Sequence, residues 1–199
     1  MFEDFETYIQ SKGSFTEDDL KQMRSLAAFR KLRRHQFLLQ EGEICNTKTF
    51  VTKGLLRAYL LKPDGTEHIM RFAAESTWMI DHESYTFRTP TKYYIEALED
   101  TEIISWTRDD INKLFEAIPS FRQYSEQLKE RSMNESQQRI LANISYSAEE
   151  KYNAFVAANE NVFNRVPLHM VASYLGVSRE TLSRVRHSEY NRAKKKNVG

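Results

Sequence analysis

The residues best suited to chemistry lie in one short segment near the C-terminus, "YLGVSRETLSRVR" at residues 174–186. Arg179, Glu180, Arg184 and Arg186 follow closely after a glycine and a serine. A guanidinium can donate two parallel hydrogen bonds to guanine O6 and N7, and a carboxylate can accept one from the amino group of cytosine. Side chains of these types on one helix predict contact with the exposed edges of DNA bases.

The residues around this segment predict a helix-turn-helix. Pro167 stands where a first helix would begin, and Ala172 is small enough to let two helices cross closely. Gly176 can adopt the positive φ of a tight turn, and Ser178 can cap the second helix. We expect Ala172, Gly176 and Leu182 to form the scaffold. The side chains that would then face outward are Ser178, Arg179, Glu180, Ser183, Arg184 and Arg186. An ordinary helical hairpin with a solvated charged face would not explain this register.

Charge is unevenly distributed along the 199-residue chain. The formal net charge is +1, yet residues 161–199 contain eight Lys or Arg and only two Asp or Glu. The remainder is therefore net acidic. A basic end on an acidic chain predicts an anionic partner such as double-stranded DNA. The tail "NRAKKK" at 191–196 is compatible with phosphate contact and equally with solvated lysines.

The rest of the chain has to position this segment, and its hydrophobic pattern changes along the way. Up to about residue 30 apolar residues recur at helical spacing, with Thr16 as a candidate N-cap and Phe29 still in phase. Between residues 35 and 106, short β-rich runs are separated by turn signals such as "PDG" at 63–65. Many short strands joined by turns predict a sandwich or roll.

One long helix is expected from Pro119 to about Ser145, because neither glycine nor proline follows Pro119 in this stretch. A helix of about 26 residues is about 39 Å long, longer than one small roll can cover. We therefore expect it to link two domains or to meet a second copy of the chain through Phe121, Tyr124 and Leu128. The alternative is a core helix of a single domain.

Together these patterns predict an α+β protein in three parts. Residues 1–118 would form a helical lead-in and an antiparallel, jelly-roll-like β-roll, residues 119–146 a dimerisation helix, and residues 147–199 a helix-turn-helix domain. The single cysteine, Cys45, excludes an internal disulfide and fits a reducing compartment. The N-terminus lacks the apolar run of a signal peptide, and no stretch approaches the roughly 20 apolar residues of a membrane span. We expect a cytoplasmic protein without a membrane partner.

Two stretches, "SRETLSRV" at 178–185 and "VTKGLLRAYLLKPDGTEHIMRFA" at 51–73, resemble the Crp/Fnr superfamily of bacterial transcription regulators. The similarity extends from about residue 20 to 187. It implies a cyclic-nucleotide-binding-type roll, a long dimerising helix and a C-terminal helix-turn-helix, in a homodimer that reads a palindrome. It also implies that Arg179, Glu180 and Arg184 read a half-site similar to TGTGA, and that RNA polymerase is a partner. Only thirteen residues follow Arg186, so the family's C-terminal wing is expected to be shortened or absent.

The same resemblance bears on effector binding. It places the family's ribose-binding pair at Ile80-Asp81 and its phosphate-binding pair at Thr91-Lys92, so the usual glycine and arginine are missing. Asp81, Arg88 and Lys92 remain as a possible effector pocket, and nearby aromatic residues could fill it. We expect a sensor roll that has lost cyclic-nucleotide binding. A regulator that responds to cyclic AMP or to another small ligand is the alternative.

Other cofactors and catalytic activities are not expected. Cys45 alone cannot hold an iron–sulfur cluster, whereas a lone histidine ligand to haem stays open. A cupin-type metal site would need a His-x-His pair, which does not occur. The G-x-S-x-G, P-loop and dinucleotide-binding glycine motifs are also missing. We predict no catalytic residue, no metal ligand and no cofactor, with a cupin-like enzyme or a protein-binding module as the remaining alternatives.

Overall fold

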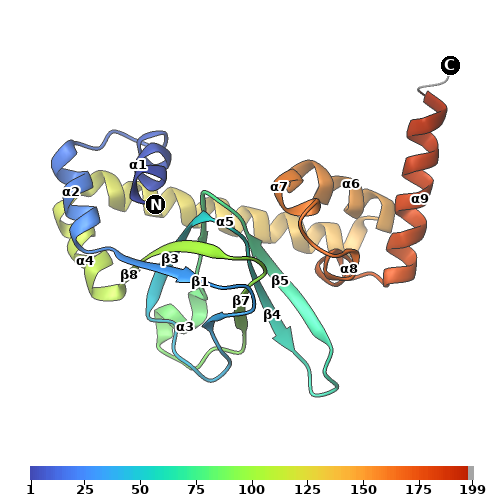
Figure 1. Ribbon diagram of the computed structural model, residues 1–199, viewed down its shortest axis with the longest axis horizontal. Coiled ribbons are helices and arrows are strands. Elements are labelled where there is room, and N and C mark those ends of the chain that lie inside the picture. Colours follow the sequence, from blue (N-terminus) through green and yellow to red (C-terminus); the bar gives the residue numbers. More distant parts are fainter. Residues whose placement is uncertain (197–199) are drawn as a thin grey trace.

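Helices lie at both ends of the chain and strands lie between them in the computed structural model (Figure 1). The structure describes the backbone of residues 1–196 and the side chains of residues 1–189. Two helices, α1 (Phe2–Gln10) and α2 (Glu17–Ser25), precede the strands. Thr16 caps α2 as predicted, since its hydroxyl accepts from the N–H of Asp19 at 3.2 Å. The helical pattern overestimated the helix at its other end, because Phe29 lies in the first strand.

Within residues 1–196, eight strands form two antiparallel sheets. The first sheet has the strand order β1-β8-β3-β6, and the second has the order β2-β7-β4-β5. Sequential strands are thus exchanged between two facing sheets, which is the arrangement of a jelly roll and confirms the predicted α+β roll. The strands are β1 (Ala28–Leu32), β2 (Phe37–Leu39), β3 (Thr47–Lys53), β4 (Leu56–Leu61), β5 (Glu67–Ala73), β6 (Thr77–Met79), β7 (Tyr94–Ala97) and β8 (Thr101–Thr107).

The first sheet is apolar on both faces, because one face lines the roll and the other carries helices. Successive side chains of a strand point to opposite faces. Val51 and Ile103 accordingly pack inside the roll against the second sheet, whereas Phe50 and Ile104 pack outside against α1 and the helices after β8. A short helix, α3 (His82–Phe87), follows β6.

Two buried tryptophans anchor the helices on this sheet. The indole N–H of Trp106 donates to the carbonyl oxygen of Met23 at 2.8 Å, and that of Trp78 donates to the hydroxyl of Tyr124 at 2.8 Å. The hydroxyl of Tyr8 lies 3.0 Å from the same Tyr124 hydroxyl. A buried indole or phenol needs a hydrogen-bond partner, so these contacts fix where α1, α2 and the long helix lie.

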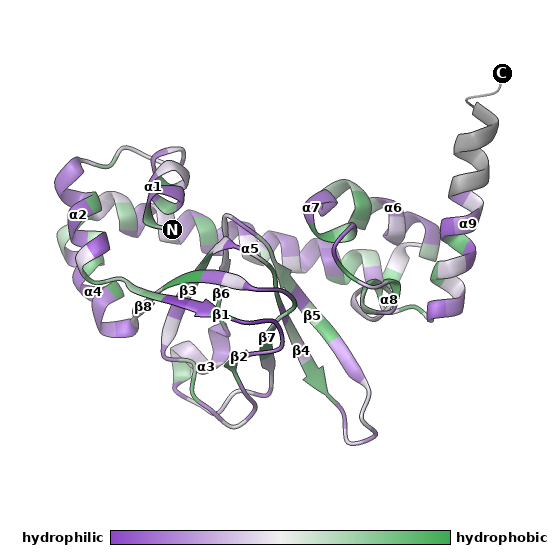
Figure 2. Cartoon of the chain, viewed as in Figure 1, coloured by the Kyte–Doolittle hydropathy of each residue, from purple (hydrophilic) through white to green (hydrophobic). Residues whose placement is uncertain are grey.

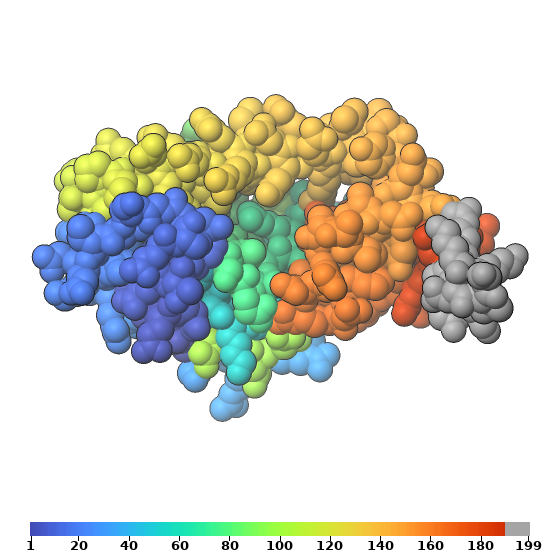
Figure 3. Space-filling view, turned by 90° about the horizontal axis from the view of Figure 1, so that it is seen from above, coloured from blue at the N-terminus to red at the C-terminus, as the bar shows by residue number. Residues whose placement is uncertain are grey.

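The long helix runs past the roll to the C-terminal helices. The helix α4 (Arg108–Ala117) follows β8, and α5 (Pro119–Ser145) begins at a proline in its first turn. Figure 3 shows α5, in yellow, along one side of the molecule from the N-terminal helices to the C-terminal ones. Hydrophilic and hydrophobic residues mix along α5 (Figure 2). None of the helices described for residues 1–196 has the length and hydropathy needed to cross a lipid bilayer.

Four further helices follow, α6 (Ala148–Ala158), α7 (Glu160–Phe163), α8 (Leu168–Leu175) and α9 (Arg179–Lys196). They share a core with Leu55 and Ala74 of the roll. The segment that could have held a wing is helical through Lys196, and no strand follows β8 within residues 1–196. The side chains of 191–196, for which the sequence leaves phosphate contact open, lie outside the described ones.

Gly54 is a position where a side chain has no space. It lies between β3 and β4 at φ +98°, and a Cβ atom there would be 2.5 Å from Thr101 Oγ1 and 2.6 Å from Thr101 Cα. Gly65, in the β4–β5 turn, has φ +82° but open space around it. Gly65→Ala therefore tests the backbone conformation alone, and Gly54→Ala tests the conformation and the collision together.

We expect Gly65→Ala to lower the free energy of unfolding by about 1 kcal/mol, and Gly54→Ala to lower it by about 1–3 kcal/mol more because of overpacking. Urea denaturation of the two variants and the wild type measures both values. Equal losses would contradict the close approach of Thr101 to Gly54.

Candidate nucleic-acid interface

The helices α8 and α9 meet at the turn that the sequence predicts. Gly176 has φ 66° and ψ 35°, in the left-handed region, and its N–H lies 3.3 Å from the carbonyl oxygen of Ser173. The N–H of Val177 donates to the carbonyl oxygen of Ala172 at 3.1 Å. Ala172 is 2% exposed and Leu182 is fully buried. The three scaffold residues thus occupy the crossing, the turn and the shared core of a helix-turn-helix.

The first turns of α9 present charged side chains to solvent. The N–H of Thr181 donates to Ser178 Oγ at 3.1 Å, so Ser178 caps the helix. The six side chains that the sequence predicts to face outward are all exposed. Arg179 forms no hydrogen bond or ion pair with another described side chain, and Arg184 has only a 3.5 Å contact with Thr181 Oγ1. These guanidiniums are therefore available to an external acceptor.

Glu180 is held in its ionised form. Hydrogen bonds from its own backbone N–H and from the Ser178 hydroxyl, together with the nearby charges of Arg179 and Arg184, lower the pKa of Glu180. An ionised carboxylate accepts hydrogen bonds and donates none. Exposed guanidiniums and an exposed carboxylate on one helix can therefore contact both partners of a G·C base pair.

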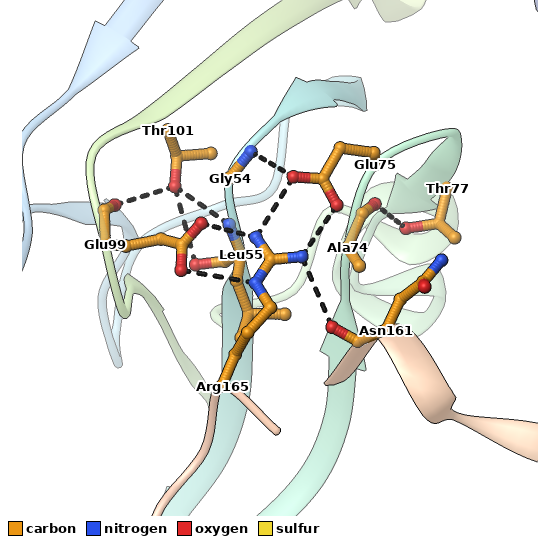
Figure 4. Close-up of polar contacts among 9 residues, drawn as sticks. All are labelled: Gly54, Leu55, Ala74, Glu75, Thr77, Glu99, Thr101, Asn161 and Arg165. Atoms are coloured by element: carbon orange, nitrogen blue, oxygen red, sulfur yellow. Dashed lines mark hydrogen bonds and ion pairs between the residues drawn. The ribbon is translucent and has the colours of Figure 1, made fainter. Parts of the chain in front are cut away.

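One arginine holds the C-terminal helices against the roll. Arg165 lies between α7 and α8, and Figure 4 shows its guanidinium between two glutamates of the roll. Its Nη1 and Nη2 donate to the two carboxylate oxygens of Glu75 at 2.8 and 3.0 Å. Its Nε lies 3.3 Å from Glu99 Oε2, and Nη2 also donates to the other Glu99 oxygen. The Glu75 carboxylate accepts in addition from the N–H of Gly54 at 2.7 Å.

These ion pairs change the protonation behaviour of their members. Burial acts to raise the pKa of Glu75, but hydrogen bonds from Arg165 and from backbone N–H groups, with the charge of Arg165, lower it overall. The hydrogen bonds to Glu75 and Glu99 raise the pKa of Arg165. The two glutamate side chains are 38% and 41% exposed, so water screens each pair to at most about 1 kcal/mol.

A second contact joins α8 to β5, the edge strand of the second sheet. The hydroxyl of Ser173 accepts from the N–H of Ile69 at 3.0 Å and donates to the carbonyl oxygen of Glu67 at 2.8 Å. A single serine thus satisfies two backbone groups of an edge strand. Arg139 of α5 donates to the carbonyl oxygen of Met70 on the same strand, and its guanidinium lies 4.5 Å from the ring centre of Tyr174.

The effector-pocket residues are only partly brought together. Asp81 caps α3 through the N–H groups of Glu83 and Ser84, at 3.1 and 3.3 Å, and it accepts from Thr91 Oγ1 at 2.6 Å. Lys92 lies 3.8 Å from the Glu83 carboxylate, and Arg88 ends α3 as an exposed residue with φ 57°. A ribose hydroxyl would therefore have to displace Thr91 from Asp81.

The predicted dimer stripe requires a correction. Phe121 and Tyr124 are 2% and 6% exposed in the chain's own core, and Leu128 packs against that core. The apolar pattern was correct, but the sheet's outer face and α1 cover this half of α5. Exposed apolar side chains begin later on the helix and continue just past its end: Met133 64%, Ile140 60%, Leu141 51%, Ile144 80% and Tyr146 42%.

Sequence reasoning missed the contacts that hold the C-terminal helices. It counted Arg165 with the basic charge of the C-terminal segment, whereas the structure pairs Arg165 with Glu75 and Glu99. These partners are 90 and 66 positions away, and no local spacing rule joins residues so far apart. Within the described part of the chain, no group of three or more His, Cys, Asp or Glu side chains is placed to hold a metal ion.

An N-terminal β-roll, a long helix and a C-terminal helix-turn-helix with a charged, exposed second helix define a class, the DNA-binding regulators that carry a sensor roll. The model of the cyclic nucleotide-binding domain family matches residues 29–117. Over 188 residues the chain is 23% identical to the transcriptional activator protein Anr of Pseudomonas aeruginosa, covering 86% of this chain and 75% of that protein.

Solved structures show the same fold. FixK2 from Bradyrhizobium japonicum superimposes with a TM-score of 0.73 at 17% identity, covering 84% of this chain and 86% of that one. The catabolite activator protein of Thermus thermophilus has a TM-score of 0.57 at 20% identity, over 90% and 86%. The chain belongs to the Crp/Fnr superfamily of transcription regulators, which confirms the resemblance noted in its sequence and a regulatory rather than an enzymatic role.

We expect Arg165→Gln to lower the free energy of unfolding by about 1–3 kcal/mol near neutral pH, because it leaves two facing carboxylates without their cation. The folded-state pKa of Glu75 lies below its ordinary 4.5. The ion pair therefore contributes fully above that value and is lost as the pH falls through the lowered pKa.

Urea denaturation between about pH 7 and about pH 3 measures the difference between variant and wild type. That difference should shrink as the solution becomes acidic. Arg122→Gln, which removes an exposed arginine of α5, should show no such pH dependence. A difference that stays constant with pH would contradict the assignment.

Proposed function

We propose that this chain binds DNA as a homodimer and that its two α9 helices read the two halves of a palindromic site. The observation that carries this proposal is the exposed set of Arg179, Glu180 and Arg184 directly after a left-handed turn at Gly176. Two recognition helices related by a two-fold axis read half-sites about 34 Å apart.

Within this site the side chains have distinct roles. Arg179 and Arg184 donate to guanine O6 and N7, and Glu180 accepts from the amino group of cytosine. Ser178, Ser183 and Arg186 contact phosphates and fix the register. A half-site similar to TGTGA follows from the family resemblance of these positions, and neighbouring DNA shape adjusts it.

The second half of α5 supplies the dimer contact in this proposal. Met133, Ile140 and Ile144 are spaced by seven and four residues, so they lie on one face of the helix. They are among the most exposed apolar side chains in the described structure, at 64%, 60% and 80%. Association with a second α5 would bury this face, which a monomer leaves in water.

Regulation in this proposal is positional. The C-terminal helices contact the roll through Arg165 and Ser173, and contact α5 through Arg139 near Tyr174. A signal that moves the roll relative to α5 therefore changes the spacing and direction of the two α9 helices, as a shift between two populations. RNA polymerase is the partner that the family implies, and a DNA-binding role places the chain in the bacterial cytoplasm.

Arg179→Ala should weaken binding to the preferred duplex by about 1–3 kcal/mol and relax the preference at one base pair, because one bidentate contact is lost. Selection from a random duplex library, followed by titration at a fixed salt concentration, measures both effects. Arg122→Ala removes an exposed arginine from α5 and should leave both unchanged. Equal weakening on preferred and random duplexes would show that Arg179 contacts only the backbone.

Ile144→Glu should shift the chain from dimer to monomer at micromolar concentration, because it would bury a carboxylate without a partner at the contact. The side chain is 80% exposed in the single chain, so the fold should tolerate the change. Light scattering gives the mass, with Gln123→Glu at the exposed start of α5 as the charge-matched control. A wild type that is monomeric without DNA would contradict the dimer proposal.

A further inference from the structure

A cavity of about 270 Å³ lies where α5 passes the strands β5 and β6 and the end of α1. Its apolar wall includes Trp78, Ile80, Phe121 and Leu128. Its polar wall is almost entirely cationic. Among the residues that line it, the charged ones are Lys12, Lys48, Arg71, Lys129, Arg131 and a single carboxylate, Glu135.

Lys48 is a charged group of this wall that lacks a counter-charge. Its Nζ donates to Ser125 Oγ at 3.3 Å and lies 5.2 and 5.7 Å from the ring centres of Phe115 and Tyr85. No carboxylate of the described residues forms an ion pair with it. Burial, and then the charge of Lys129, lower the pKa of Lys48 to about 8.

Arg71 is in the same position on the opposite side of the cavity. It lies on β5 and is half-buried, yet its guanidinium forms no hydrogen bond or ion pair with any described residue. Burial lowers the pKa of Arg71 against the attraction of Glu135. A guanidinium carries five N–H donors, and buried charges in proteins are normally paired. Two unpaired cations that share one cavity therefore indicate that an anion completes it.

We propose that this cavity binds a small organic anion, a carboxylate or a phosphate with a short apolar body, held by Lys48 and Arg71 against the Trp78 and Phe121 side. The volume lies just below the roughly 300–1,000 Å³ of sites for drug-sized ligands, which favours a small occupant. None of Asp81, Arg88 and Lys92 lines this cavity, so its binding groups differ from those at the cyclic-nucleotide positions.

The position of the cavity gives the anion a regulatory effect, and this part alone depends on the proposed function. Arg71 belongs to β5, and Lys129 and Arg131 belong to α5. An anion between them attracts β5 and α5 toward each other. The same strand carries the backbone groups that bind Ser173 of α8. Binding in the cavity therefore acts on the contact that positions the helix-turn-helix.

Calorimetry on the full chain without DNA tests the binding, with phenyl phosphate, benzoate, inorganic phosphate and neutral benzamide as probes. At least one of the two aryl anions should bind with a dissociation constant below about 1 mM, and benzamide should give no heat. The stronger of the two aryl anions identifies phosphate or carboxylate as the preferred group. Inorganic phosphate should bind more weakly, because it leaves the apolar wall unfilled.

Variants assign the binding to this cavity. Arg71→Gln should weaken the aryl anion about tenfold or more, because a charge-assisted hydrogen bond is lost. Lys129→Gln, at an exposed position that folding does not require, should weaken it by a smaller factor. Arg88→Gln removes a cation near the cyclic-nucleotide positions and should leave the affinity unchanged. Without anion, Arg71→Gln should melt no lower than the wild type, because it removes an unpaired cation.

Absence of binding by all probes at about 10 mM, or equal weakening by Arg71→Gln and Arg88→Gln, would overturn the inference. Failure of the DNA-binding proposal would be distinct. A chain that binds an aryl anion but no duplex contradicts only the proposed function, and a chain that selects a duplex but binds no anion contradicts only this inference.

Discussion

The guanidinium of Arg165 between Glu75 and Glu99 is the contact on which the arrangement of this molecule depends. Glu75 follows β5 and Glu99 precedes β8, so the two carboxylates come from different connections of the roll. Arg165 stands just before α8, and the turn at Gly176 then sets the direction of α9. The place of the charged helix relative to the roll therefore follows from one planar group with two acceptors, which accepts only a narrow range of orientations.

Direction and stability come from different contacts at this junction. The Arg165 pairs are partly exposed and contribute little free energy each. Most of the stabilisation comes from apolar burial, in which Leu55 and Ala74 of the roll join the core of the C-terminal helices. The rings of Phe155 and Tyr174 lie 5.2 Å apart beside Phe72 of β5. Apolar packing holds the surfaces together without specifying one orientation, and the ion pairs and Ser173 select it.

The sequence predicted the features that depend on neighbours along the chain. Ala172, Gly176 and Leu182 act within one turn-and-helix unit, and the Thr16 cap involves residues three positions apart, so type and spacing are sufficient. The role of Arg165 depends on which strands the roll brings to its surface, and nothing within a few residues encodes that. The stripe at Phe121 and Tyr124 failed for the same reason. An apolar helix face has the same spacing whether a sheet of its own chain or a second chain covers it.

The cationic cavity carries the same lesson into regulation. Lys48 and Arg71 are 23 positions apart on strands of different sheets, so their shared lack of a counter-charge is visible only after folding. An anion that binds there can influence DNA only if it binds the two arrangements of the C-terminal helices with different affinity. The effect is then reciprocal, and DNA on α9 must change the affinity for the anion by the same factor. Since each Arg165 ion pair contributes at most about 1 kcal/mol, an anion that discriminates by little more than tenfold is sufficient to shift the balance.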